Sequence, residues 1–330
     1  MRNKLIFRAD GNADIGLGHL YRLLGFHSLI SQMDHYFITR KSSLIHFFPN
    51  DIEILFCPES IEKEIEWIKE VFPASESIIV ADGYHFDFKY QSELKSLGYK
   101  LIIIDDFIQE KYASNVILNP APISATMDFK GIEVFGIDHA LLRTEFIEIS
   151  KLNRKPREIK NCFISFGGSD LNKISIKVSQ MLLEENKFEE LHVLAGISVE
   201  NELKAQIGSR NNVFIHKNLN ANQLISVMQK CEIAIVPSST ISYEVLCCGL
   251  FVISGTYVDN QNLIYNGLLE RNLIFGLGDF NKIKKLNLIE AIDKIIELSQ
   301  SKQNVYLENQ KKFFHGQQKE NLNNLISSLR

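Results

Sequence analysis

The stretch LIFRADGNADIGLGHLYR, residues 5–22, decides the fold. It opens with an apolar run of strand length, Leu5–Ala9, and passes through a glycine-containing turn into a helix expected to begin at Gly18. A strand, a glycine turn and a helix in this order are typical of the first unit of a doubly wound α/β domain. The turn is not a dinucleotide fingerprint, because Tyr21 stands where the third glycine of Gly-x-Gly-x-x-Gly belongs.

The same alternation of apolar runs and amphipathic stretches continues through both halves of the chain, which predicts parallel sheets covered on both faces. Strands are expected at 5–9, 35–39, 53–56, 78–81, 101–104, 116–118, 162–166, 191–194, 213–215, 233–236 and 251–254. Helices are expected at 18–32, 61–71, 89–97, 173–185, 199–207, 222–229, 242–248 and 261–270.

The segment Ser150–Lys160 is polar and basic and contains Pro156, so it is typical of a linker. We therefore expect two Rossmann-type domains, 1–150 and 151–330, that face each other across a cleft. The second domain carries a helical tail from about Leu286, where isoleucines and leucines recur at helical spacing.

Composition excludes several classes of protein. The 330 residues include 36 Lys plus Arg and 40 Asp plus Glu, so the net charge of −4 gives no electrostatic reason to bind nucleic acid or anionic lipid. No apolar run approaches the ~20 residues that cross a bilayer, and charged residues interrupt the N-terminus where a signal peptide would be apolar. The 5 cysteines have no Cys-x-x-Cys spacing, which indicates a reduced, cytoplasmic protein. No obligate protein partner is inferred.

Candidate catalytic side chains follow the strands of the first half. His19 is expected in the first turn of a helix, whose positive end disfavours an imidazolium, so a neutral ring could act as a general base. A histidine that only caps or packs the helix is the alternative. Asp82 follows the fourth strand, where it could contact a ligand, orient a histidine or cap the next helix. A metal site at Asp105-Asp106 is disfavoured, because the chain has no Asp-x-Asp motif and no zinc-ligand spacing.

The second half contains two turns suited to a phosphate. Gly167-Gly168-Ser169 follows one expected strand, and Ser238-Ser239-Thr240 leads from another strand into a helix that contains Glu244. Small residues and free N–H groups at a helix N-terminus bind phosphate. An ordinary Ser/Thr cap is the alternative for each turn alone, but two such turns in one domain favour a diphosphate.

These motifs together resemble a known family. Gly167-Gly168-Ser169, the Ser238-Ser239-Thr240 turn with Glu244, and Asp259-Asn260-Gln261 resemble the nucleotide-sugar half of MurG-like GT-B proteins. Gly16-Leu17-Gly18-His19 with Arg22, together with Ala81-Asp82-Gly83-Tyr84 and the segment 136–146, narrows the resemblance to the PseG-like UDP-sugar hydrolases. The chain departs from the family pattern at Gly83, where a histidine is expected, and at His139, where a tyrosine is expected.

The resemblance implies removal of UDP from UDP-2,4-diacetamido-2,4,6-trideoxy-β-L-altropyranose in pseudaminic acid biosynthesis, without a metal or cofactor. It implies that water attacks the anomeric carbon with inversion. His19 would be the base and Tyr84 would position water or sugar. The implied substrate-binding residues are Asp10, Gly16, Gly18, Arg22, Asp82, Gly167, Gly168, Ser169, Ser238, Ser239, Thr240, Glu244, Asn260 and Gln261.

Two other functions remain open from the sequence. A GT-B glycosyltransferase would use the same UDP-sugar site, with His19 taking a proton from an acceptor hydroxyl in place of water. A non-catalytic nucleotide-sugar-binding protein would need no base, and the presence of His19 and Tyr84 argues against it.

Overall fold

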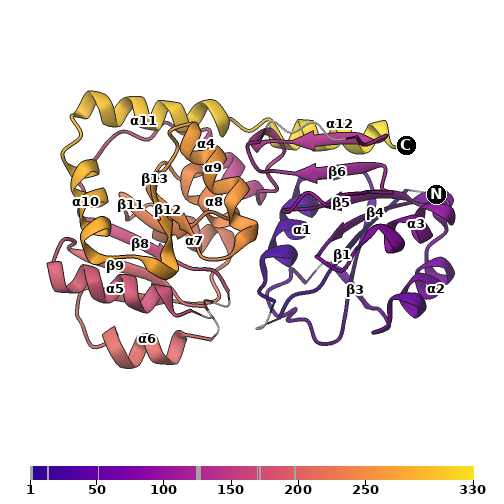
Figure 1. The fold of residues 1–330 in the computed structure, drawn as a ribbon, viewed down its shortest axis with the longest axis horizontal. Helices are drawn as coiled ribbons and strands as arrows, with labels where there is room; N and C mark the ends of the chain where they lie inside the picture. Colours follow the sequence, from indigo (N-terminus) through magenta and orange to yellow (C-terminus); the bar gives the residue numbers. More distant parts are fainter. Residues whose placement is uncertain are drawn as a thin grey trace. The chain divides into compact units, whose positions relative to one another are not determined.

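The computed structural model describes residues 3–12, 15–50, 52–123, 128–168, 170, 172–196 and 198–330. The chain forms two compact units (Figure 1). The first contains the described residues up to Asn12, Leu17–Arg143 and Gln317–Arg330, and the second contains residues 15–16 and Thr144–Gly316. This division differs from the expected one at residue 150, because a short helix before the linker belongs to the second unit and the last helix belongs to the first.

The first unit is built on a seven-stranded parallel sheet in the order β3-β2-β1-β4-β5-β6-β7. Its strands are β1 (Lys4–Ala9), β2 (Asp34–Thr39), β3 (Glu53–Phe56), β4 (Ser77–Asp82), β5 (Lys100–Ile104), β6 (Val116–Asn119) and β7 (Ile132–Phe135). Its helices are α1 (Gly18–Leu29), α2 (Ile61–Val71), α3 (Phe88–Ser96) and α12 (Gln318–Ser328). The strand order reverses between β1 and β4, and ligands of open parallel sheets bind beyond the carboxyl ends of the strands at such a point.

The second unit repeats this plan with a six-stranded parallel sheet in the order β10-β9-β8-β11-β12-β13. Its strands are β8 (Asn161–Ser165), β9 (Glu190–Leu194), β10 (Val213–His216), β11 (Ile233–Pro237), β12 (Phe251–Thr256) and β13 (Phe275–Asp279). Its helices are α4 (Thr144–Ser150), α5 (Ile174–Glu185), α6 (Glu200–Ile207), α7 (Ala221–Met228), α8 (Thr240–Cys247), α9 (Asn262–Glu270), α10 (Lys285–Ile296) and α11 (Gln300–Phe313).

The predicted α/β architecture is confirmed, and every expected strand agrees with the structure within two residues at each end. Two strands were missed, β7 and β13. Both lie at the edge of their sheet, so neither needs the continuous apolar run that marks a central strand. Two glycines also interrupt β13, which lowers its strand propensity.

The helical tail is an integral part of both units. The apolar face of α10 is buried in the core of the second unit through Leu288, Ile292 and Ile295. The last helix, α12 (yellow in Figure 1), packs on α1 of the first unit, and Gln318 donates to the carbonyl of Ile137. None of the helices in the described ranges is long and apolar enough to cross a membrane.

The segment that leads out of the first unit lies against a glycine of α1. A Cβ atom on Gly25 would lie only 2.5 Å from the carbonyl oxygen of Leu141, so a side chain at this helical position cannot be accommodated without a shift of backbone. The cation of Arg143 stands 5.5 Å from the ring centre of Tyr21 on the same helix. Leu141 and Arg143 of the family-like segment 136–146 are therefore both packed against α1.

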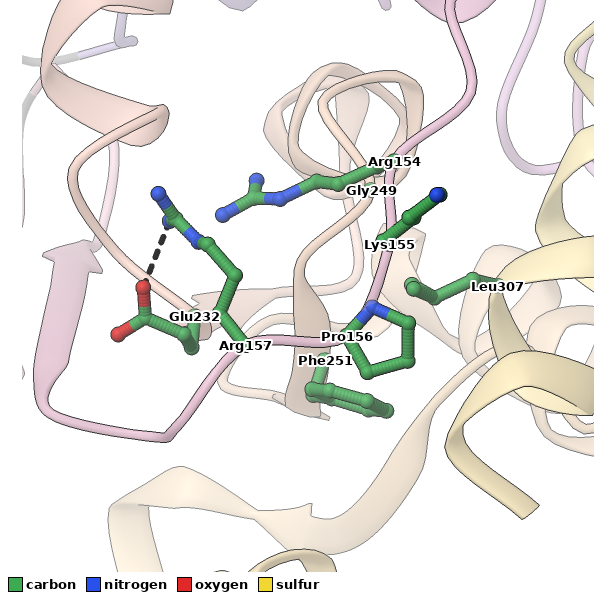
Figure 2. A pocket seen from close by; sticks show the side chains of 8 residues that line it. All are labelled: Arg154, Lys155, Pro156, Arg157, Glu232, Gly249, Phe251 and Leu307. Carbon is green, nitrogen blue, oxygen red and sulfur yellow. Dashed lines mark ion pairs between the residues drawn. The ribbon is translucent and has the colours of Figure 1, made fainter. Parts of the chain in front are cut away.

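The linker is fixed to the second unit by two arginines (Figure 2). Arg154 donates to the carbonyls of Cys248, just after α8, and of Cys231, and Arg157 pairs with Glu232 at 2.6 Å. Burial and the nearby charge of Arg157 lower the pKa of Arg154 to about 10. The small hollow lined by these residues lies at the amino ends of β11 and β12, the edge opposite to that where such sheets bind ligands. We therefore assign it a structural role.

Candidate active site

Four side chains of the first unit converge beyond the carboxyl ends of β4 and β5. His19 stands in the first turn of α1, and Asp82 is the last residue of β4. Nδ1 of His19 lies 2.7 Å from Oδ1 of Asp82, and Nε of Arg22 donates to Oδ2 of Asp82 at 2.8 Å. Arg22 also donates to Asp106, two residues after the end of β5. His19 and Arg22 are three residues apart and share one face of the helix, so one buried carboxylate holds both.

The contacts of His19 determine its tautomer. Oδ1 of Asp82 can only accept a hydrogen bond, so at 2.7 Å the facing Nδ1 must carry the proton. Arg22 Nη2 lies 3.2 Å from the same nitrogen, but it donates to Oδ1 of Asp82 at 2.5 Å. The neutral ring therefore keeps its lone pair on Nε2. A histidine oriented in this way by a carboxylate can accept a proton from a substrate or from water.

Asp82 is ionised in the folded protein. Burial alone would raise the pKa of its carboxyl, but the positive charge of Arg22 and the hydrogen bonds from His19 and Arg22 outweigh burial and hold that pKa below its ordinary value. Burial likewise opposes the charge of Arg22, while Asp106 and Asp82 raise its pKa well above the usual value. The carboxylate thus keeps its negative charge beside His19, where it would stabilise an imidazolium.

The ring of Tyr84 covers His19 on the side that faces solvent. The two rings pack edge-on with centroids 4.9 Å apart, and the Tyr84 side chain is half exposed.

The helix after β4, α3, is capped by Asp87, whose carboxylate accepts from the Tyr90 amide. The helix-cap alternative for Asp82 is therefore wrong, and its carboxylate is used to orient His19.

Asp10, at the carboxyl end of β1, belongs to a second buried charge cluster. Its Oδ1 accepts from Arg8 at 2.7 Å and from the backbone amide of Arg40 at 2.8 Å. Arg8 is fully buried and forms a two-pronged pair with Glu64 of α2, at 2.8 and 2.9 Å. Oδ2 of Asp10 faces Nε2 of His85 at 3.6 Å. Burial alone would raise the pKa of Asp10, but the bonds and charges of Arg8 and Arg40 lower it.

The glycines of the first turn have separate roles. Gly16 has a φ of +81°, a conformation that favours glycine, and Gly18 begins α1 with open space where a Cβ would stand. Gly16 thus supplies a backbone conformation that other residues rarely adopt, and Gly18 leaves the start of α1 without side-chain bulk. Asp105 accepts from the amides of Phe107 and Gln109 in its own loop, and Asp106 is paired with Arg22.

In the second unit, the two predicted phosphate turns differ. Asp170 caps α5: its carboxylate accepts from the amides of Ile174 and Ser175 and from the Ser175 hydroxyl. Burial outweighs these hydrogen bonds and raises the pKa of the Asp170 carboxyl, and this side chain already occupies the end of the helix. Gly167, with a φ of +80°, is exposed after β8 and Gly168 is partly exposed, whereas Ser169 lies outside the described residues.

The N-terminus of α8 is not capped by the Ser239 side chain. The first amides of a helix have no intrahelical acceptor, so those that follow Ser239 can bind an anion. Ser238 is fully buried, and its hydroxyl lies 2.8 Å from that of Ser254 in β12. This contact holds the turn against the neighbouring strand. Thr240 begins the helix and is partly exposed. Of the two turns, the geometry favours this one for a phosphate.

The remaining predicted residues of the second unit lie near the same sheet edge. Glu244 is in α8, one turn after Thr240, and is buried. Asn260 and Gln261 form a short helical turn after β12. The Gln261 side chain accepts from the amide of Tyr257 at 2.9 Å, so it closes its own loop.

The sequence alone did not identify Asp106 as a partner of Arg22, nor Arg8, Glu64 and His85 as parts of the Asp10 cluster. The one available signal was the charge of Arg8 inside an apolar strand, which requires a buried counter-charge. Among the described residues, no group of three or more His, Cys, Asp or Glu side chains is arranged to hold a metal ion.

The resemblance seen in the motifs is confirmed by known proteins. The chain is 25% identical over 265 residues to the UDP-2,4-diacetamido-2,4,6-trideoxy-β-L-altropyranose hydrolase of Campylobacter jejuni, a match that covers 78% of this chain and 93% of the relative. No protein-family profile matches the chain.

Solved structures show that the fold is GT-B. The structure resembles Acinetobacter baumannii MurG with a TM-score of 0.64 and 10% identity over 99% of both chains. It resembles the spinosyn rhamnosyltransferase SpnG with a TM-score of 0.70 and 11% identity over the full length of both chains. At these identities the likeness concerns architecture alone.

The site predicts a sensitivity to acid. Burial, followed by the charge of Arg8, lowers the pKa of His85 to about 4. In the unfolded chain that pKa returns to about 6.5, so the unfolded state takes up the proton first as the pH falls. The stability contributed by the neutral ring is therefore complete above about pH 6.5 and is lost as the pH falls toward 4.

Between about pH 7.5 and pH 5, we expect the free energy of unfolding of the wild type to fall more than that of His85→Gln, as measured by urea denaturation. His315→Gln, which replaces an exposed ring, is the control and should follow the wild type. Parallel pH dependences of the wild type and His85→Gln would show that the ring is not kept neutral by folding.

Proposed function

We propose that this protein hydrolyses a UDP-activated diacetamido-trideoxy sugar to UDP and the free sugar, as the name of its Campylobacter jejuni relative states for that enzyme. The observation that carries the proposal is the His19–Asp82 contact at 2.7 Å, which leaves Nε2 of His19 as a proton acceptor. A protein that only binds nucleotide sugars has no use for a base oriented in this way.

The reaction would proceed by direct displacement at the anomeric carbon. Nε2 of His19 takes a proton from water while the water oxygen bonds to the anomeric carbon. The bond from that carbon to the UDP oxygen breaks, its electron pair leaves with UDP, and the configuration inverts. Asp82 remains ionised and stabilises the imidazolium that forms, which is the role of the carboxylate in a catalytic triad. Tyr84, packed on the His19 ring, would position the water or the sugar.

The second unit would bind the nucleotide. UDP is a good leaving group, so the main requirement is to stabilise the negative charge that develops on its diphosphate. The uncapped N-terminus of α8 after Ser239 offers backbone amides and the positive end of the helix dipole for this purpose. Glu244 on the same helix would accept hydrogen bonds from the ribose, and Gly167 and Asn260 would contact the rest of the UDP-sugar.

The test of the proposed function is incubation with UDP-2,4-diacetamido-2,4,6-trideoxy-β-L-altropyranose in ¹⁸O-labelled water without any acceptor sugar. We expect release of UDP and of free sugar, with the label in the sugar, because the carbon–oxygen bond is the one that breaks. Label in UDP would contradict attack at carbon. UDP release only after addition of an acceptor would instead identify a glycosyltransferase.

A pair of variants separates the two halves of the proposal. His19→Asn retains polarity but cannot take the proton, so kcat should fall by about 10²–10⁴-fold while the affinity for UDP stays unchanged. Glu244→Ala is the matched variant on the second unit and should weaken UDP binding measured by calorimetry. A rise in KM with unchanged kcat in His19→Asn would make His19 a binding residue. Unchanged UDP affinity in Glu244→Ala would remove the ribose assignment.

A further inference from the structure

The loop that follows β5 holds its shape through one buried carboxylate. Asp105 accepts from the amide of Phe107 at 2.9 Å and from the amide of Gln109 at 3.1 Å, and it also accepts from the hydroxyl of Tyr112. The Tyr112 oxygen in turn accepts from the Gln109 amide at 2.7 Å. Asp105 is therefore committed to the loop itself.

The same loop contains an unfavourable backbone conformation. Ile108 has a φ of +61°, in the left-handed region that a β-branched side chain rarely adopts. Such conformations persist only where surrounding contacts impose them, and they occur preferentially at functional sites. Here the bonds to Asp105 on either side of Ile108 impose it.

The result of this loop shape is an exposed ring that contacts Tyr84, the residue packed on His19. Phe107 keeps 51% of its surface exposed, and its ring packs edge-on against Tyr84 with centroids 5.3 Å apart. Tyr84 is itself 54% exposed and contacts His19. The three rings form a continuous row from the His19–Asp82 pair out to solvent.

We infer that Phe107, together with Tyr84, binds a methyl group of the substrate sugar and thereby selects methyl-bearing sugars. This inference rests on the proposed function. The proposed substrate has three methyl groups, because carbon 6 is deoxygenated and carbons 2 and 4 each carry an acetamido group. An aromatic face next to the base gives those methyl groups an apolar partner, and their contact covers ring surface that water otherwise hydrates.

The proposal predicts a substrate-dependent effect of Phe107→Ala. With the trideoxy diacetamido substrate, kcat/KM should fall by about 10-fold or more, the range in which a hydrophobic pocket discriminates one methyl-sized group. Phe107→Leu keeps an apolar side chain and should retain most of the activity. Phe214→Ala removes an exposed ring of the second unit and should behave as the wild type, which controls for loss of exposed aromatic surface.

Three substrate analogues identify the methyl group: one with a hydroxyl on carbon 6, one with a hydroxyl in place of the acetamido group at carbon 2, and one with the same change at carbon 4. The analogue that lacks the contacted methyl should lose less than about 3-fold on Phe107→Ala, and the other two should show the full loss. An equal loss with all three analogues, or no loss with the parent substrate, overturns the inference.

A binding measurement separates this inference from the proposed function. In the His19→Asn background the intact UDP-sugar should survive titration calorimetry. Adding Phe107→Ala should weaken UDP-sugar binding by about 10-fold and leave UDP binding unchanged. If the wild type fails to hydrolyse the substrate but this difference persists, the proposed reaction is wrong and the methyl-binding role stands. If hydrolysis occurs and the difference is absent, only the methyl-binding role is wrong.

Discussion

The carboxylate of Asp82 is the constraint on which the candidate site depends. It is completely buried at the end of β4, and it is shared by His19 and Arg22 from one turn of α1. An unpaired carboxylate in this position would be costly, so β4 and α1 must come together before Arg22 can compensate its charge. The arrangement that satisfies the buried charge is also the one that orients His19.

The same relation between charge and geometry appears at Asp10. Arg8 lies within a central strand with no exposed surface, and Glu64 and Asp10 neutralise it from two sides. A buried ion pair is weak evidence for stability, because apolar residues of similar volume often stabilise a protein as well. Its value here is positional: Arg8 and the Arg40 amide fix one oxygen of Asp10, so that the other faces His85 beside Tyr84.

Local sequence patterns predicted most of the fold because strands buried on both faces, such as β4 and β11, are continuous apolar runs. They also placed His19, Asp82 and Ser239 at the strand and helix ends. They could not predict the pairing of Arg22 with Asp106, which joins residues 84 positions apart, nor that Asp170 caps its own helix while Ser239 leaves α8 open. The return of α12 to the first unit depends on tertiary packing that no local pattern encodes.

The central claim is that Asp82 holds His19 with its proton on Nδ1, so that Nε2 is the base. Side-chain ¹⁵N NMR of labelled protein measures this directly, with the His19 resonances assigned by their loss in His19→Asn. The account predicts a protonated Nδ1 and an unprotonated Nε2 in the neutral ring, and loss of that preference in Asp82→Ala. A neutral His19 ring protonated on Nε2 in the wild-type protein would contradict it.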